Sequence, residues 1–274
     1  MTGTLLLLLV IFGPQTRGPD LAPCTGLRWI VNAGSLERSR VEVELQRKYF
    51  DSPCTFLVGD GAGPADYRGW TSVRTRTITS LAGLDGAIRD PTADAVLYDP
   101  EGWDMTPPEE QSHPAEATCR AASAAHASHK PLIATPAINL VRFLRRGAPA
   151  GGQRFAEFEQ TGIAGDIARC ADVYEIQAQG AEMNRDQFRA FVTAEVLQAR
   201  AANPGIVVLA GISTNPMGQH VTAQRVLEAV ESVRAVVNGF WLNIPAGGTY
   251  CPSCGEPQPR VAVELLRLLK LELE

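Results

Sequence analysis

Two carboxylates stand close together at the end of an apolar segment that reads Ala95-Val-Leu-Tyr-Asp99-Pro-Glu101. In an extended strand alternate side chains share a face, so Leu97, Asp99 and Glu101 point the same way. The two acids then lie roughly 6 to 7 Å apart at Cα. Neighbouring acids drive their pKa values apart, and glycosidic cleavage needs one protonated and one charged carboxyl. The spacing predicts Glu101 as proton donor and Asp99 as its charged partner. The alternative is that Asp99 only caps an Asp-Pro turn and Glu101 is solvated.

A second strand segment carries three polar residues on one face, namely Glu175, Gln177 and Gln179. Apolar residues flank each of them, and buried polar groups must be satisfied by hydrogen bonds. Such a run is more typical of a binding site than of packing, although a structural polar network remains the alternative. Glu175 is therefore a second candidate for the charged partner of Glu101.

Further polar and aromatic side chains follow or end other strand segments and lie in the long 100–114 loop. Amides and hydroxyls bind sugar hydroxyls, and tryptophans offer stacking surfaces, so this mixture favours a carbohydrate. With Gln177 and Gln179, the predicted substrate-binding residues are Asn32, Asp60, Trp103, Ser213, Asn215, Trp241 and Asn243.

The elements that would position these residues alternate along the whole chain. Short apolar segments predict strands at 29–33, 55–59, 72–79, 95–99, 131–135, 173–177, 206–212 and 239–244. Amphipathic stretches between them predict helices at 35–50, 84–89, 115–128, 153–162, 185–202, 222–236 and 259–273.

Eight such units predict parallel pairing and closure into a single (β/α)8 barrel of the TIM type over residues 24–274. In this fold, polar residues at the carboxyl ends of strands form the site. A doubly wound open sheet is the alternative, but no Gly-x-Gly-x-x-Gly follows the first strand, so a dinucleotide site is not indicated.

Residues 94–101 resemble the fourth-strand signature of chitinase-like, family-18-type glycoside hydrolases, Asp-x-x-Asp-x-Asp-x-Glu, with the first, third and fourth acids present. The resemblance implies that Glu101 is the general acid and that Asp99 orients an acetamido group of the substrate. Trp241 and Tyr174 are similar to that family's sugar platform and acetamido partner.

This sequence also departs from the family pattern. Leu97 replaces the middle acid, and Pro100 separates the catalytic pair. Tyr174 is expected to point away from Glu175 and Gln177, because neighbouring residues of a strand face opposite sides.

The sequence offers fewer suitable residues for other kinds of catalysis. Lys130 precedes its strand, so no lysine is placed for a Schiff base, and no Gly-x-Ser-x-Gly elbow occurs. Four histidines are too few and too scattered for a zinc site. A divalent cation held by Asp99, Glu101 and Glu175 stays open as an alternative, but we expect no cofactor.

Composition limits the partners. The chain has 274 residues, a formal net charge of −5 and 45% hydrophobic residues, with basic residues scattered along it. We therefore expect a small-molecule or oligosaccharide substrate, no nucleic-acid partner and no stable insertion of the chain into a membrane. A carbohydrate- or peptide-binding barrel without catalysis is the rival interpretation, and the sequence leaves the oligomeric state undetermined.

The first segment and the cysteines point to export. Residues 5–12 form an apolar run that is too short to span a bilayer and has the length of a signal-peptide core, so residues 1–23 are expected to be a leader. The alternatives are a wrongly assigned start of the chain or an amino-terminal element that packs on the domain. Six cysteines suit an oxidising compartment, which predicts the pairs Cys24–Cys54 and Cys251–Cys254. Cys119 and Cys170 are either a third bridge or two buried thiols.

Overall fold

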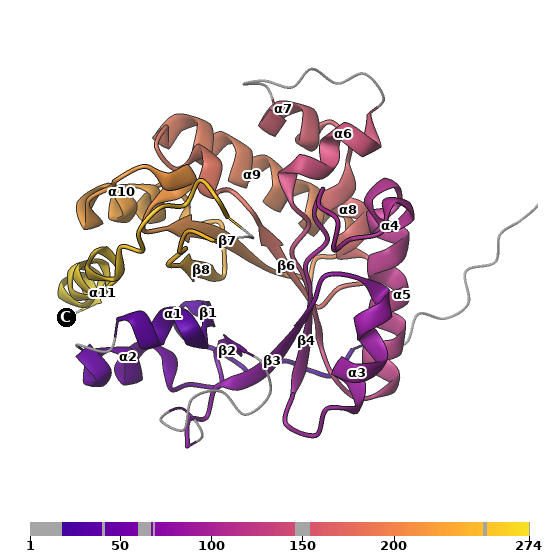
Figure 1. Ribbon diagram of the computed structural model, residues 1–274, viewed down its shortest axis with the longest axis horizontal. Helices are drawn as coiled ribbons and strands as arrows, with labels where there is room; N and C mark the ends of the chain where they lie inside the picture. The colour runs from indigo at the N-terminus through magenta and orange to yellow at the C-terminus, as the bar shows by residue number, and fades with distance from the viewer. Residues whose placement is uncertain are drawn as a thin grey trace, which may run out of the picture.

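Eight parallel strands close into a barrel in the computed structural model of the protein, which describes residues 18–39, 42–59, 67, 69–145, 154–248 and 251–273. Each strand pairs with its neighbour in sequence, and the last pairs back with the first (Figure 1). The strands are β1 (Arg28–Asn32), β2 (Thr55–Val58), β3 (Val73–Ile78), β4 (Ala95–Tyr98), β5 (Leu132–Ala134), β6 (Val173–Ile176), β7 (Val207–Ser213) and β8 (Gly239–Asn243). The predicted single (β/α)8 TIM barrel is confirmed, and each predicted strand end agrees to within one residue.

Helices surround the barrel and connect its strands (Figure 1). They are α1 (Ala33–Arg38), α2 (Val43–Phe50), α3 (Leu84–Arg89), α4 (Pro108–Ser112), α5 (Pro114–Ala127), α6 (Val141–Leu144), α7 (Arg154–Glu159), α8 (Ile163–Ala168), α9 (Arg185–Ala202), α10 (Ala223–Val233) and α11 (Pro259–Leu273). Short 3-10 turns add η3 (Leu81–Gly83), η4 (Ile138–Leu140), η5 (Gln179–Ala181) and η6 (Pro216–Gly218).

The prediction of one helix over 35–50 is wrong, because α1 and α2 are separate. Ser39 ends α1, and its hydroxyl donates to the carbonyl oxygens of Ser35 and Leu36. The buried amide of Gln46 then donates to the carbonyl oxygens of Leu36 and Ser39, each over 2.9 Å. Side chains thus satisfy the carbonyls that a continuous helix would have bonded to later backbone N–H groups. Helices α4, α6 and α8 were also not predicted.

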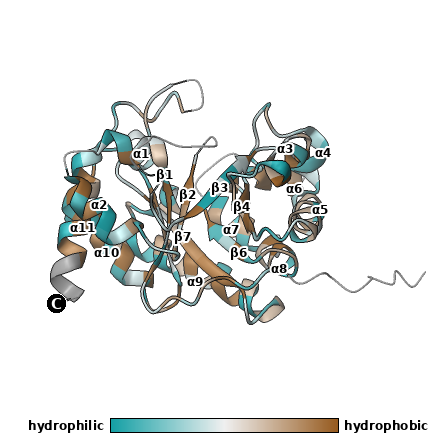
Figure 2. Cartoon of the chain, turned by 90° about the horizontal axis from the view of Figure 1, so that it is seen from below, coloured by the Kyte–Doolittle hydropathy of each residue, from teal (hydrophilic) through white to brown (hydrophobic). Residues whose placement is uncertain are grey.

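The strands form at continuous apolar runs of the sequence, because the strands of a parallel barrel are buried on both faces. Figure 2 shows the hydrophobic colour concentrated on the strands at the centre. The buried residues that pack together inside the barrel are Ile30, Phe56, Val58, Ala95, Leu97, Ile133, Val173 and Leu209. Leu97 therefore fills the core layer, as the predicted direction of Asp99 requires.

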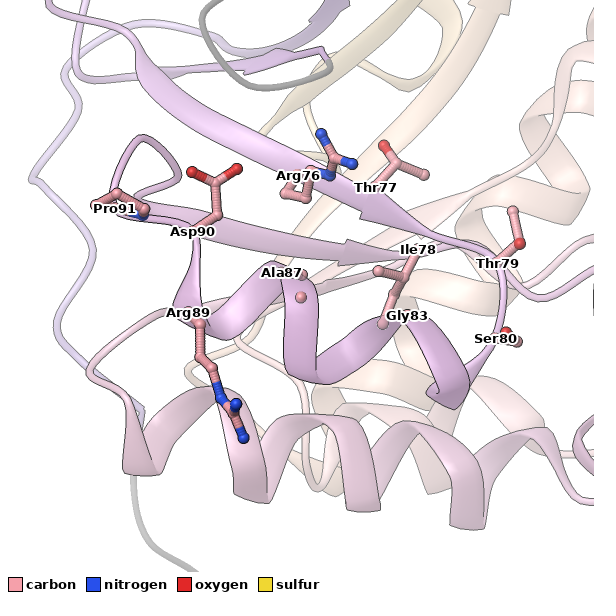
Figure 3. A pocket seen from close by; sticks show the side chains of 11 residues that line it. Arg76, Thr77, Ile78, Thr79, Ser80, Gly83, Ala87, Arg89, Asp90 and Pro91 are labelled. Carbon is pink, nitrogen blue, oxygen red and sulfur yellow. The ribbon is translucent and has the colours of Figure 1, made fainter.

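Strand β3 differs from the others on its outer face. The connection from β2 to β3 contains no α-helix among its described residues, and β3 turns Arg74 and Arg76 outward. Arg74 pairs with Asp94 at 2.8 Å. A cavity of about 580 Å³ lies between β3 and α3, with Arg76, Ile78 and Asp90 among its lining residues (Figure 3). This cavity lies outside the barrel and holds none of the predicted catalytic acids.

Three disulfides join residues that lie outside the strands. The bonds Cys24–Cys54 and Cys251–Cys254 confirm the predicted pairs, and Cys119–Cys170 forms the third. Within the described part of the chain, no helix combines the length and the apolar character needed to cross a bilayer. The apolar run of the predicted leader lies outside the described residues.

Candidate functional site

Asp99 joins the carboxyl ends of three neighbouring strands. It directly follows β4, Thr135 directly follows β5, and Gln177 directly follows β6. The Thr135 hydroxyl donates to Asp99 Oδ1 over 2.8 Å, and the Gln177 amide donates to the same oxygen over 2.9 Å. Gln177 Nε2 also donates to the backbone oxygen of Thr135 over 2.9 Å. The Asp99 carboxylate is thus held across the barrel mouth rather than used to cap its own turn.

Burial raises the pKa of Asp99 to about 6, while the hydrogen bonds from Thr135 and Gln177 oppose the rise. Donors stabilise the charged form of a carboxyl, and desolvation disfavours it. Both donors bind Oδ1, and Oδ2 has no protein donor among the described residues. Asp99 is therefore largely ionised at neutral pH with one oxygen open to a ligand.

Glu101 has a higher pKa than Asp99. Burial, and then the negative charge of Asp99, raise the pKa of Glu101 to about 8, and a hydrogen bond with Asn139 opposes the rise. Like charges close together cannot both ionise easily. The influence of Asp99 on the pKa of Glu101 reflects the proximity of the two carboxyls. Strand alternation does not explain this proximity, because β4 ends at Tyr98.

The backbone around Glu101 is fixed by side chains from two loops. Thr106 Oγ1 accepts from the Glu101 backbone N–H over 3.1 Å and from Trp103 Nε1 over 3.0 Å, and it donates to the Thr79 carbonyl over 2.8 Å. Asn139 Oδ1 accepts from the Gly102 N–H over 2.7 Å. Thr106 is buried, so these bonds are shielded from water. They hold the segment that carries the predicted proton donor.

Glu175 is fully buried inside the barrel. Among the described residues neither of its carboxyl oxygens has a hydrogen-bond partner. Burial, and then the charge of Asp99, raise the pKa of Glu175 well above its ordinary value. Burial thus favours the neutral form of Glu175, whereas the hydrogen bonds from Thr135 and Gln177 favour the charged form of Asp99.

Several predicted binding residues have structural partners. Asn32 Oδ1 caps α1 by accepting from the Gly34 N–H over 2.9 Å. Asn215 is buried and donates to the Cys254 carbonyl over 2.6 Å, and its own N–H is bonded to Ser213 Oγ. These contacts give Asn32, Ser213 and Asn215 a role in holding the loops.

The remaining predicted binding residues lie in different surroundings. Trp241 packs against the inner barrel cluster, and Asn243 is partly exposed at the end of β8. Trp103 is partly exposed beside the Glu101 segment. Asp60 lies outside the described residues. Gln179 lies at the start of η5, and its amide is close to Glu175 above β7.

Tyr174 faces away from the site, as strand alternation predicts. Its hydroxyl donates to Glu195 Oε2 on α9 over 2.6 Å, and both residues are buried outside the barrel. This bond removes Tyr174 as the acetamido partner that the family resemblance implies.

Sequence reasoning did not single out Thr135, Asn139 and Thr106. Thr135 and Asn139 follow β5, where position at a strand end was an available signal. For Thr106 no local signal exists, because its partners Glu101, Trp103 and Thr79 become known only in the folded chain. Among the described residues, no group of three or more His, Cys, Asp or Glu side chains is arranged to hold a metal ion.

A scan against protein-family models finds no match for the chain, and a search of curated proteins finds none either. The structure is similar to HMG-CoA lyase from Brucella melitensis, with a TM-score of 0.53 and 11% identity over 90% of this chain and 92% of that one.

Two sugar-active proteins are less similar in structure. A class V chitinase from Pseudomonas fluorescens Pf-5 has a TM-score of 0.42 and 13% identity over 69% of each chain. A glycoside hydrolase family 17 beta-1,3-glucanosyltransferase from Rhizomucor miehei has a TM-score of 0.44 and 8% identity over 79% of this chain and 85% of that one. At these identities the shared feature is the barrel fold, which hosts many unrelated functions.

Proposed function

We propose that this protein is a glycoside-hydrolase-like enzyme that cleaves a carbohydrate with Glu101 as proton donor and Asp99 as charged partner. The observation that carries the proposal is the unequal environment of the acids. Asp99 receives two hydrogen bonds that stabilise its charge, whereas burial and the charge of Asp99 raise the pKa of Glu101 to about 8. Paired carboxyls with separated pKa values are the requirement of glycoside hydrolysis.

The proton balance of the reaction follows from these states. Glu101 gives its proton to the leaving glycosidic oxygen as the bond to the anomeric carbon breaks. Asp99 stabilises the positive charge that develops on the sugar, through the oxygen that Thr135 and Gln177 leave open. Water then adds to the anomeric carbon, and its proton returns to Glu101, so the enzyme ends in its starting state.

Aromatic side chains near the acids support a sugar as the substrate. Trp103 shares its anchor, Thr106, with the backbone of Glu101, so its ring belongs to the segment that carries the proton donor. Trp241 lies on β8, and its ring packs against the inner barrel cluster. Flat apolar rings beside polar groups complement the faces and hydroxyls of a sugar.

The test compares the purified protein with its Glu101→Gln variant on a panel of amino-sugar and neutral oligosaccharides, with product analysis by mass spectrometry. General acid catalysis contributes about 10²- to 10⁴-fold, so the variant is expected to lose turnover by that factor while still binding the glycan. Turnover that is unchanged in Glu101→Gln rejects the proton-donor role. Binding without turnover by the unmodified protein supports the rival, a non-catalytic carbohydrate-binding barrel.

We also propose that the protein is exported. Three disulfides support this, because such bonds form and persist in oxidising compartments. Fusion of residues 1–23 to a reporter that is active only outside the cytoplasm tests the leader. A reporter that stays inactive, beside an active control with an established leader, contradicts it.

A further inference from the structure

Glu175 has no part in the proton transfers above, yet its surroundings are energetically unfavourable for a carboxyl group. Its side chain is fully buried in the barrel, and among the described residues both carboxyl oxygens lack a hydrogen-bond partner. A buried polar group without partners costs roughly 1 to 3 kcal/mol. A leucine of similar size would avoid that cost, so packing does not explain a carboxyl at this point.

The neighbouring strand has no side chain where Glu175 lies. A Cβ atom on Gly211 of β7 would come within 2.6 Å of Glu175 Oε1 and within 2.5 Å of Gln179 Nε2. Real Cβ atoms essentially never approach so closely, so only glycine lets both side chains lie against β7. The polar ends of the Glu175 and Gln179 side chains therefore both lie beside Gly211.

Trp241 adds a third polar group from the next strand. It pairs with Gly211 in the register of β7 and β8, and it packs with the residues inside the barrel. Its indole Nε1 is buried and has no partner among the described residues. Gly211 therefore lies between Trp241 on one neighbouring strand and Glu175 on the other.

The donors and acceptors around Gly211 match an uncharged oxygen. A protonated carboxyl donates one hydrogen bond, an indole N–H donates another, and a carboxamide can donate or accept. A charged ligand group would lose its hydration here, and Asp99 is the ionised side chain nearby.

We propose that Glu175, Gln179 and Trp241 form a subsite that binds an uncharged hydroxyl or carbonyl oxygen of the substrate beside Gly211. The identity of the ligand as a carbohydrate rests on the proposed function. The subsite selects neutral sugars, whether plain or acylated on nitrogen, and rejects sugars whose carboxylate would occupy this position.

The binding test uses the full chain carrying Glu101→Gln, so that bound glycan is not consumed. Calorimetry measures affinity for tetramers of N-acetylglucosamine, glucose and galacturonic acid. We expect one neutral tetramer to bind and the galacturonic acid tetramer to bind at least tenfold more weakly. Adding Glu175→Leu is expected to weaken the neutral ligand about tenfold, whereas adding Glu175→Gln, which keeps a donor and an acceptor, changes affinity less than threefold. Glu195→Gln, a buried acid outside the barrel, is the matched control.

A ligand-free measurement tests the subsite by itself. The pKa of folded Glu175 lies above its unfolded value of about 4.3, so ionisation of this group in the unfolded chain lowers the stability of the protein progressively as pH rises from that value toward the folded pKa. Glu175→Gln cannot ionise, so its melting temperature relative to the unmodified protein is expected to rise by several degrees between pH 4 and pH 8. A difference that stays constant or falls with pH overturns a neutral Glu175.

The two proposals fail in different ways. If no neutral tetramer binds the Glu101→Gln protein, the carbohydrate function and the ligand of the subsite are both rejected. If a neutral tetramer binds but Glu175→Leu leaves its affinity unchanged, the subsite is rejected while the proposed function stands. Equal losses in Glu175→Gln and Glu175→Leu also reject it, because they require an ionised carboxylate.

Discussion

The side-chain amide of Gln177 donates to Oδ1 of Asp99 over 2.9 Å and so joins the end of β6 to the end of β4. The strand between them contributes the second donor, Thr135, to the same oxygen. Two residues that are distant from Asp99 in sequence thus stabilise its charge against the effect of its burial. Substitution of either donor is therefore the most direct way to test the role of Asp99.

If Asp99 must be ionised and Glu101 protonated, turnover of an identified glycan is expected to be highest between about pH 6 and pH 8. Activity rises with pH as Asp99 loses its proton, and falls as Glu101 loses its own. Gln177→Leu removes a donor that stabilises the charged Asp99, so the acidic limb of the kcat/KM profile should move to higher pH. Thr135→Ser keeps its hydroxyl and serves as the control. An acidic limb that stays in place in Gln177→Leu contradicts the assignment.

Tyr174→Phe is expected to destabilise the protein without moving that pH profile. The change leaves Glu195 buried without the hydroxyl that donates to it, at a cost of about 1 to 3 kcal/mol in the free energy of unfolding. Urea denaturation measures the loss. Tyr174→Phe combined with Glu195→Leu should recover part of the stability, because no buried polar group is then unpaired. A stable Tyr174→Phe protein with a large rise in KM would instead place Tyr174 at the substrate.

The disulfides should differ in what they contribute to stability. Cys119 and Cys170 are 51 residues apart in sequence, whereas Cys251 and Cys254 are 3 apart. Chain entropy predicts about 4 kcal/mol for the first bond and about 1.6 kcal/mol for the second. Paired substitutions by alanine, followed by thermal unfolding, test the order. A larger loss in Cys251→Ala/Cys254→Ala would show that loop closure does not govern these bonds.

Asn215→Ala is expected to loosen the loop that carries the Cys251–Cys254 bond. The substitution leaves the Cys254 carbonyl without the donor that now lies 2.6 Å away, and it removes a buried side chain. A loss of about 1 to 3 kcal/mol in unfolding free energy is expected, with faster proteolysis between residues 251 and 258. The exposed Gln219→Ala is the control and should stay close to the unmodified protein. Unchanged proteolysis in Asn215→Ala would rule out this tether.

The sequence by itself determined the fold and the direction of the strand residues. Eight apolar segments alternate with amphipathic segments along the chain, which predicts the barrel. Parallel strands are buried on both faces, so the ends of the apolar segments also predict the ends of the strands. Period-two geometry also directed Asp99, Glu175 and Tyr174 to the correct sides. Two disulfides were predictable from the spacing and compartment of the cysteines.

Only the tertiary structure decided the charge of each acid and the partners of the loop residues. Asp99 and Glu175 both point into the barrel, but among the described residues only Asp99 receives donors, which come from the ends of neighbouring strands whose register the sequence does not state. The break between α1 and α2 depends on Gln46 reaching back to Ser39. Hydrogen bonds and desolvation act over a few ångströms between residues far apart in the chain, so their effects become defined when the barrel closes.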